Sequence, residues 1–142
     1  MSFSINAEIV DTETGRIIDY TPLSDFVSND TKFLADYMEI FTAMSDKFYQ
    51  FSNLDLETIV FLKENILYPE SDKRQTYFTP EKWLEILNKI NFDENKIKEL
   101  YIDAFTDIDI DDAIIMKESF DDLIKYLEYL KYKKVRVGLS YC

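Results

Sequence analysis

The side chains in this sequence that could do chemistry are mainly carboxylates, and they are concentrated between residues 103 and 122. Eight acidic residues and a single basic one, Lys117, fall within these twenty positions. Carboxylates crowded away from water repel one another and recruit cations, so the segment should face solvent or something positive. The eight acids are Asp103, Asp107, Asp109, Asp111, Asp112, Glu118, Asp121 and Asp122.

Four of these acids follow the spacing of an EF-hand calcium loop, which the segment resembles. Asp107, Asp109 and Asp111 fall at loop positions one, three and five, and Glu118 falls at position twelve. Three short carboxylates and one longer one could then converge on a cation. Asp112 occupies the sixth position, where the sharp turn requires glycine. A degenerate calcium-binding module is therefore one alternative function, with Asp107, Asp109, Asp111 and Glu118 as the metal ligands.

Most catalytic sites are excluded by the residues that the chain lacks. It has no histidine, and its only cysteine is Cys142. Ser–His and Cys–His nucleophile pairs, Cys/His zinc sites and internal disulfides therefore cannot be built. Its two glycines are far apart, which excludes glycine-rich phosphate loops. A carboxylate-metal hydrolase needs only Asp and Glu and remains an alternative, but we expect a non-enzymatic protein without a cofactor.

The net charge indicates the kind of partner. The chain has 28 acidic and 16 basic residues, a net charge of −12. Such a field repels nucleic acid and anionic membranes, so we expect neither as a direct partner. We expect a binding or inhibitor protein whose carboxylates pair with Lys and Arg of a basic protein. The expected contact residues are Asp107, Asp109, Asp111, Asp112, Asp121 and Asp122.

In general character this small acidic chain is similar to bacterial toxin-immunity proteins and to phage inhibitors of host defence. The similarity is one of type and fixes no family. The chain has no basic leader and no apolar run of the roughly 20 residues that cross a bilayer, so we expect a cytoplasmic protein. Its oligomeric state is not indicated.

Strands are predicted at both ends of the chain. Apolar residues alternate over 3–10, a turn follows at 11–15, and 16–20 return as a second strand of a hairpin. Alternation over 135–141 predicts a further strand, which should pair with the hairpin because isolated strands leave backbone groups unsatisfied. Both ends of the chain should then lie in one sheet.

Helical spacing predicts five helices between these strands. The first runs from the cap at Asn29 or Asp30 to about residue 50, and the second follows Ser52 or Asn53 and ends before Pro69. The third begins at Thr79-Pro80, the fourth follows Asp93, and the fifth opens at Ser119, which with Asp122 forms a capping box. Residues 106–118 are ambiguous.

The predicted fold is a single α+β domain over 1–142. A small antiparallel sheet, formed by the N-terminal hairpin and the C-terminal strand, packs against about five helices. The alternative is a mostly helical protein with a peripheral ribbon.

Three tyrosines flank the apolar stripe of the last helix. Tyr126, Tyr129 and Tyr132 could belong to the edge of the core or to an interface, since tyrosine is enriched at interfaces. The core edge is favoured, because tyrosine is often half buried. A basic cluster (Lys131, Lys133, Lys134 and Arg136) follows, and there we expect compensation of the helix dipole.

Overall fold

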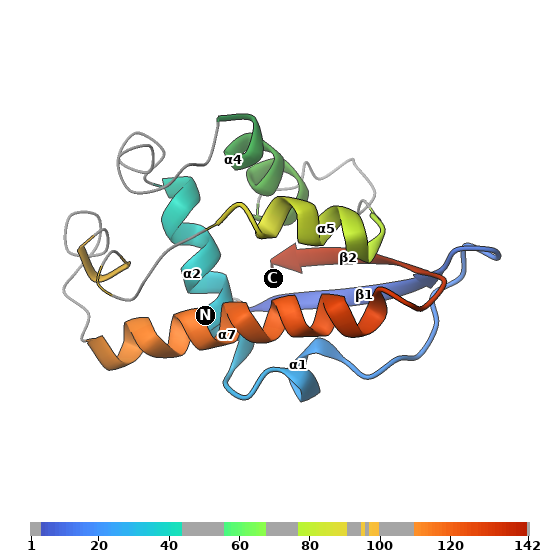
Figure 1. The fold of residues 1–142 in the computed structure, drawn as a ribbon, viewed down its shortest axis with the longest axis horizontal. Helices are drawn as coiled ribbons and strands as arrows, with labels where there is room; N and C mark the ends of the chain where they lie inside the picture. Colours follow the sequence, from blue (N-terminus) through green and yellow to red (C-terminus); the bar gives the residue numbers. More distant parts are fainter. Residues whose placement is uncertain are drawn as a thin grey trace.

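The fold is α+β, as predicted, with a two-stranded antiparallel sheet beside a group of helices (Figure 1). The computed structural model describes residues 4–43, 56–67, 77–90, 95, 97–99 and 110–141. Strand β1 (Ile5–Asp11) pairs with β2 (Val135–Tyr141), from Ile5 opposite Tyr141 to Asp11 opposite Val135. The two ends of the described chain therefore meet in one sheet.

Six helical segments lie between the strands in the described residues. Residues 95 and 97–99 are also helical, and the rest of the predicted fourth helix lies outside the described residues. So do the predicted caps at Ser52, Asn53 and Asp93 and the stop at Pro69. The six segments are α1 (Leu23–Phe26), α2 (Thr31–Ala43), α4 (Leu56–Leu62), the π-helix η1 (Lys63–Leu67), α5 (Pro80–Leu87) and α7 (Ile110–Leu130).

The predicted second strand of the hairpin is reduced to a single bridge. Gly15 takes the turn with a φ of 71°, and Asp11 Oδ1 accepts the backbone N–H groups of Glu13 and Thr14. Beyond the turn, however, only Ile17 pairs with β1, opposite Val10. After this bridge the chain continues without further strand pairing to Pro22, which directly precedes α1.

The start of the last helix was predicted wrongly. Helix α7 begins at Ile110, nine residues before the expected cap at Ser119. Ser119 is fully buried inside the helix, and its hydroxyl donates to the carbonyl of Ile115 at 3.0 Å. Apolar residues three and four apart continue the helical stripe back through Met116 and Ala113. This stripe determines the start of the helix more strongly than the Ser119–Asp122 pair does.

Helix α5 begins where the sequence predicted. Thr79 caps it by accepting the N–H of Lys82 at its hydroxyl (3.3 Å), and Pro80 occupies the first turn. The buried Trp83 donates its indole N–H to the carbonyl of Val137 at 2.7 Å. Phe78 also bridges to Val137. These bonds tie α5 and the residues before it to β2.

Helix α7 forms one wall of the core. It packs against α2, α5 and α1, and its buried stripe belongs to the same hydrophobic core as the buried residues of β1 and β2. The stripe includes Ala113, Met116, Phe120, Leu123, Leu127 and Leu130. No helix in the described residues is long and apolar enough to cross a membrane. The opposite side of α7 faces outward, and it carries most of the described residues that were singled out from the sequence.

Candidate acidic binding site

The acidic residues predicted to bind a partner are divided between the start and the middle of α7. Asp111 and Asp112 lie in its first turn, where the helix dipole favours negative charge. Asp111 is exposed and Asp112 is half-buried. Asp107 and Asp109 lie outside the described residues, so their part in the site remains a prediction.

Asp121 and Asp122 are adjacent in sequence but have different partners. Asp121 forms an ion pair with Lys117 at 2.6 Å and stays about half exposed. The Asp122 side chain is only 13% exposed, and one of its carboxylate oxygens accepts both the N–H (3.0 Å) and the hydroxyl (3.1 Å) of Ser28. Asp122 therefore holds the loop after α1 against α7, and its carboxylate is largely occupied within the molecule.

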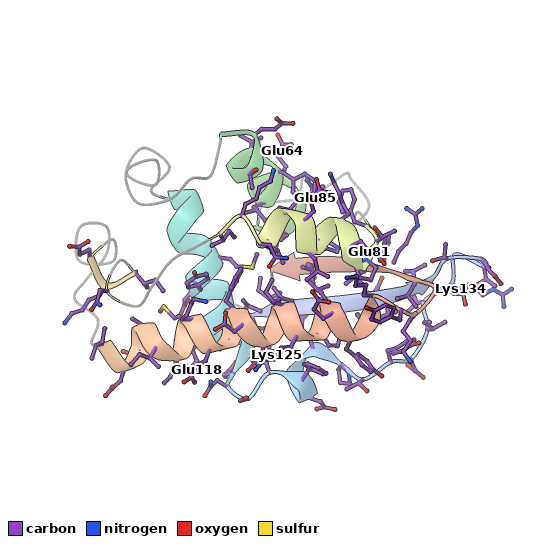
Figure 2. All side chains as sticks on the ribbon, in the orientation of Figure 1. Glu64, Glu81, Glu85, Glu118, Lys125 and Lys134 are labelled. Carbon is purple, nitrogen blue, oxygen red and sulfur yellow. The ribbon has the colours of Figure 1, made fainter. Side chains whose placement is uncertain are left out.

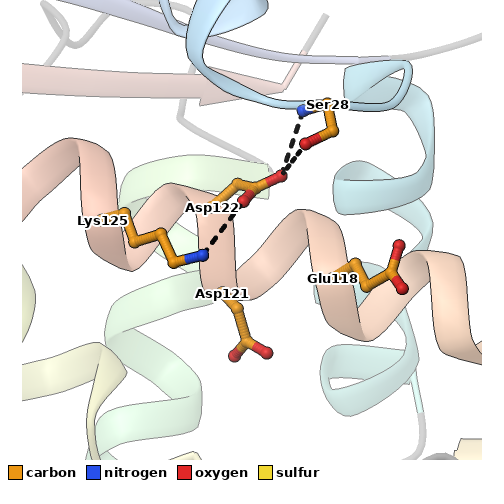
Figure 3. Close-up of a pocket in the computed structure, with 5 residues that line it drawn as sticks. All are labelled: Ser28, Glu118, Asp121, Asp122 and Lys125. Carbon is orange, nitrogen blue, oxygen red and sulfur yellow. Dashed lines mark hydrogen bonds and ion pairs between the residues drawn. The ribbon is translucent and has the colours of Figure 1, made fainter.

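An open pocket of about 240 Å³ lies where this loop meets α7. Figure 2 places Glu118 and Lys125 along the same helix. Figure 3 shows Asp122 turned toward Ser28, while Asp121 and Glu118 point away from it. Lys125 Nζ lies 3.9 Å from Asp122. The pocket is lined by Ser28, Glu118, Asp121, Asp122 and Lys125.

The lining of this pocket suits a cationic group. Three carboxylates face a single lysine, and Glu118 is exposed and forms no ion pair among the described contacts. Carboxylates of this kind accept hydrogen bonds from ammonium and guanidinium groups. The arrangement can therefore bind the end of a lysine or arginine side chain.

The loop expected for calcium is helical in the part that the structure describes. Residues 110–118 belong to α7, so Asp111 and Glu118 are about 10 Å apart along the helix axis. They do not converge as positions five and twelve of a calcium loop do. The described residues contain no group of three or more potential metal ligands. Because Asp107 and Asp109 lie outside these residues, the four-carboxylate site remains a prediction. Its second half, however, is helical and does not form the loop that the prediction required.

Two residues of the pocket were missed by sequence reasoning. Ser28 is 94 residues from Asp122 in the chain, so no local pattern joins them. Lys125 was not singled out, although its distance of seven residues from Glu118 puts both on one side of a helix. That spacing was the available signal, and it became readable only once α7 was known to be continuous.

The C-terminal end of α7 carries exposed tyrosines and lysines. Tyr126 is buried and donates to the carbonyl of Thr21 at 2.8 Å, whereas Tyr129 is 41% and Tyr132 84% exposed. Phe26 packs between Tyr126 and Tyr129. Lys133 Nζ lies 5.5 Å from the ring centre of Tyr129. The core-edge interpretation therefore holds for Tyr126 and fails for Tyr132, because Tyr132 lies beyond the last turn of the helix.

Comparison with known proteins adds no assignment: no protein-family model, curated protein or solved structure matches this chain.

Proposed function

We propose that this protein is a non-enzymatic binding protein that inhibits a basic protein partner by covering its cationic surface. The contact surface, called the acidic face below, consists of carboxylates from the first turn to the middle of α7 and the two aspartates that come before the helix in the sequence. Its members are Asp107, Asp109, Asp111, Asp112, Glu118, Asp121 and Asp122.

One observation carries the proposal. The pocket beside Ser28 opens outward and presents Glu118, Asp121 and Asp122 with one lysine at its edge. A lysine or arginine of a partner would find charged acceptors there, and the net charge of −12 would accelerate its approach. Asp122 is mainly a support of this site, since Ser28 occupies it.

The kind of partner follows from charge. A basic nuclease or another basic nucleic-acid-binding protein would expose the lysines and arginines that such a face accepts. Blockade of this kind is how toxin-immunity proteins and phage inhibitors of host defence act in general, and we place this chain with them by type. Action in the cytoplasm, without direct contact to nucleic acid or membrane, is part of the same proposal.

The proposal predicts that the acidic face governs association rate. A partner captured from cytoplasmic extract at low salt should bind Asp111→Asn/Glu118→Gln several-fold more slowly than the native protein. Its association rate should also depend less on salt, because two steering charges are gone. Association rates measured by surface plasmon resonance over a range of NaCl concentrations check this.

The matched control is Glu81→Gln/Glu85→Gln on α5, which removes the same charge from another helix. Both of its residues are exposed. An equal loss in the two double variants would mean that only net charge matters. An unchanged rate in Asp111→Asn/Glu118→Gln would reject the acidic face as the contact.

A further inference from the structure

The segment that joins α7 to β2 carries the densest run of basic residues in the chain. Residues 131–136 contain four bases and no acid, in a molecule of net charge −12. The effect of a helix dipole falls off within the last turn, and the last turn of α7 has no basic residue. Compensation of the dipole, which the sequence led us to expect, therefore does not account for most of this charge.

Most of these cations are not paired with a carboxylate of the molecule itself. Lys131 Nζ lies 3.9 Å from Glu128. Lys133, Lys134 and Arg136 are exposed, and they form no ion pair with any residue in the part of the chain that the structure describes. These three charges are therefore available to an anion from outside.

Backbone hydrogen bonds hold this segment in a defined shape. Lys133 donates its N–H to the carbonyl of Leu130 at 2.9 Å, and the carbonyl of Lys134 accepts the N–H of Thr12 at 3.1 Å. Val135, the first residue of β2, is buried. A ligand that binds a surface ordered in this way has less conformational entropy to remove from it.

Exposed tyrosine rings lie among the cations. Tyr132 is 84% and Tyr129 is 41% exposed. Lys131 Nζ lies 5.8 Å from the ring centre of Tyr132, and Lys133 Nζ lies 5.5 Å from that of Tyr129. Phe26 supports the Tyr129 ring, with 5.7 Å between the two ring centres. Since tyrosine is enriched at protein interfaces, the surface offers a partner both positive charge and apolar area.

We propose that this surface, called the basic end below, binds a short acidic segment of a protein. The carboxylates of the segment pair with the lysines and the arginine, and an apolar side chain of the segment packs on the tyrosine rings. This contact is separate from the acidic face and does not depend on the proposed function. The members of the basic end are Tyr129, Lys131, Tyr132, Lys133, Lys134 and Arg136.

The extent of the anion favours a short protein segment over nucleic acid or an anionic membrane. Both of these extend beyond the basic end and therefore meet the negative field of the rest of the molecule. Asp122 precedes Lys131 by nine residues, which is roughly 13 Å along a helix axis and exceeds the Debye length of about 8 Å at physiological salt. Figure 2 shows Glu118 and Lys134 well apart on the molecule. A segment confined to the basic end is thus largely screened from the acidic face.

Fluorescence anisotropy of a labelled acidic peptide tests the proposal with the full chain at low salt. The probe is a hexapeptide of four glutamates and two phenylalanines. Lys133→Gln/Lys134→Gln should weaken its binding roughly five-fold, because two exposed ion pairs are lost. Tyr132→Ala should weaken it about two-fold or more at unchanged charge, because apolar contact area is lost. Circular dichroism checks that each variant is folded.

The matched control is Lys82→Gln/Lys89→Gln, which removes the same charge from exposed sites in and directly after α5. It should bind the peptide nearly as the native chain does. Asp111→Asn/Glu118→Gln should bind the peptide as well as the native chain or better, since it loses only negative charge outside the basic end. If that variant fails to bind a basic partner and still binds the peptide, the two surfaces act separately, as proposed.

Three results would overturn the inference. The first is a native chain that does not bind the peptide at millimolar concentration. The second is an equal loss of binding in the two lysine double variants, which would mean that only net charge matters. The third is tighter binding of a single-stranded thymidine oligonucleotide, or of phosphatidylserine vesicles, than of the peptide. None of these results bears on binding at the acidic face, so the proposed function would stand or fall separately.

Discussion

Tyr77 can reach Glu8 because the residue between them in the sheet is a glycine. Glu8 is opposite Gly138 in the β1–β2 pair, and the bridge from Phe78 to Val137 brings Tyr77 alongside Gly138 on the other edge. With no side chain at Gly138, the Tyr77 hydroxyl donates to Glu8 Oε1.

This contact predicts an alkaline limit to stability. The hydrogen bond to Glu8, with some burial, raises the pKa of Tyr77 to about 12. Burial raises the pKa of Tyr126 to about 12 as well. Both folded-state values exceed the usual 10, so the fold favours the protonated phenols. The stability that they contribute is complete below pH 10 and is lost between about pH 10 and pH 12. Chemical denaturation over this range should show the decline.

Ultraviolet titration of the tyrosines assigns the effect to residues. Tyr77→Phe and Tyr126→Phe should each remove one late-titrating phenol. Glu8→Gln should lower the pKa of Tyr77 and leave that of Tyr126 in place, because Glu8 acts on Tyr77 alone. Titration curves that are the same in Glu8→Gln and the native protein would contradict the assignment.

At the scale of elements, the loop after α1 depends on one carboxylate. Asp122 accepts two hydrogen bonds from Ser28, and bonds to a charged acceptor contribute about 1.5–3 kcal/mol. Asp122→Ala should therefore lower the free energy of unfolding by about 2 kcal/mol. The neighbouring Asp121→Ala breaks only an exposed pair with Lys117 and should cost less than about 1 kcal/mol. Urea denaturation compares the two variants, and equal losses would reject the role of Ser28.

The elements that could be predicted from sequence are those fixed by local patterns. The alternation of apolar and polar residues identified β1 and β2, and Thr79-Pro80 identified the start of α5. Both signals could be read because residue periodicity and helix capping depend on residues close together in the sequence. The misplaced start of α7 arose from two local signals in conflict. The Ser119–Asp122 pair resembles a cap, yet Ser119 lies in the buried stripe, and burial against α2 and α5 decides the outcome.

The candidate site was less predictable than the fold. Its carboxylates were found from their density in the sequence. Which of them can bind a partner, however, depends on contacts with residues that are distant in the chain. Asp122 was expected to meet a partner and is instead bonded to Ser28. Asp111 was expected to share a cation with Glu118, and the helix places them about 10 Å apart. A single sequence does not indicate which distant segments of the chain will contact each other.

At the scale of the whole molecule, charge is expected to limit stability. An excess of twelve negative charges repels itself more strongly in the compact state than in the unfolded chain. Raising NaCl from low to physiological concentration screens this repulsion and should raise the melting temperature. A gain of 1 kcal/mol would raise it by about 2–4 °C for a chain of this size. Thermal unfolding followed by circular dichroism measures this, and a falling melting temperature would mean that attractive pairs dominate.

The pairing of β1 with β2 also has a consequence for how the protein is made. The two strands are separated by more than 120 residues, with Ile5 bonded next to Tyr141. On a ribosome, the first strand leaves the exit tunnel long before its partner has been translated. The backbone N–H and C=O groups on its paired edge have no strand partner until β2 emerges. Contacts between residues so far apart in the chain form slowly, so we expect the sheet to form after the helices.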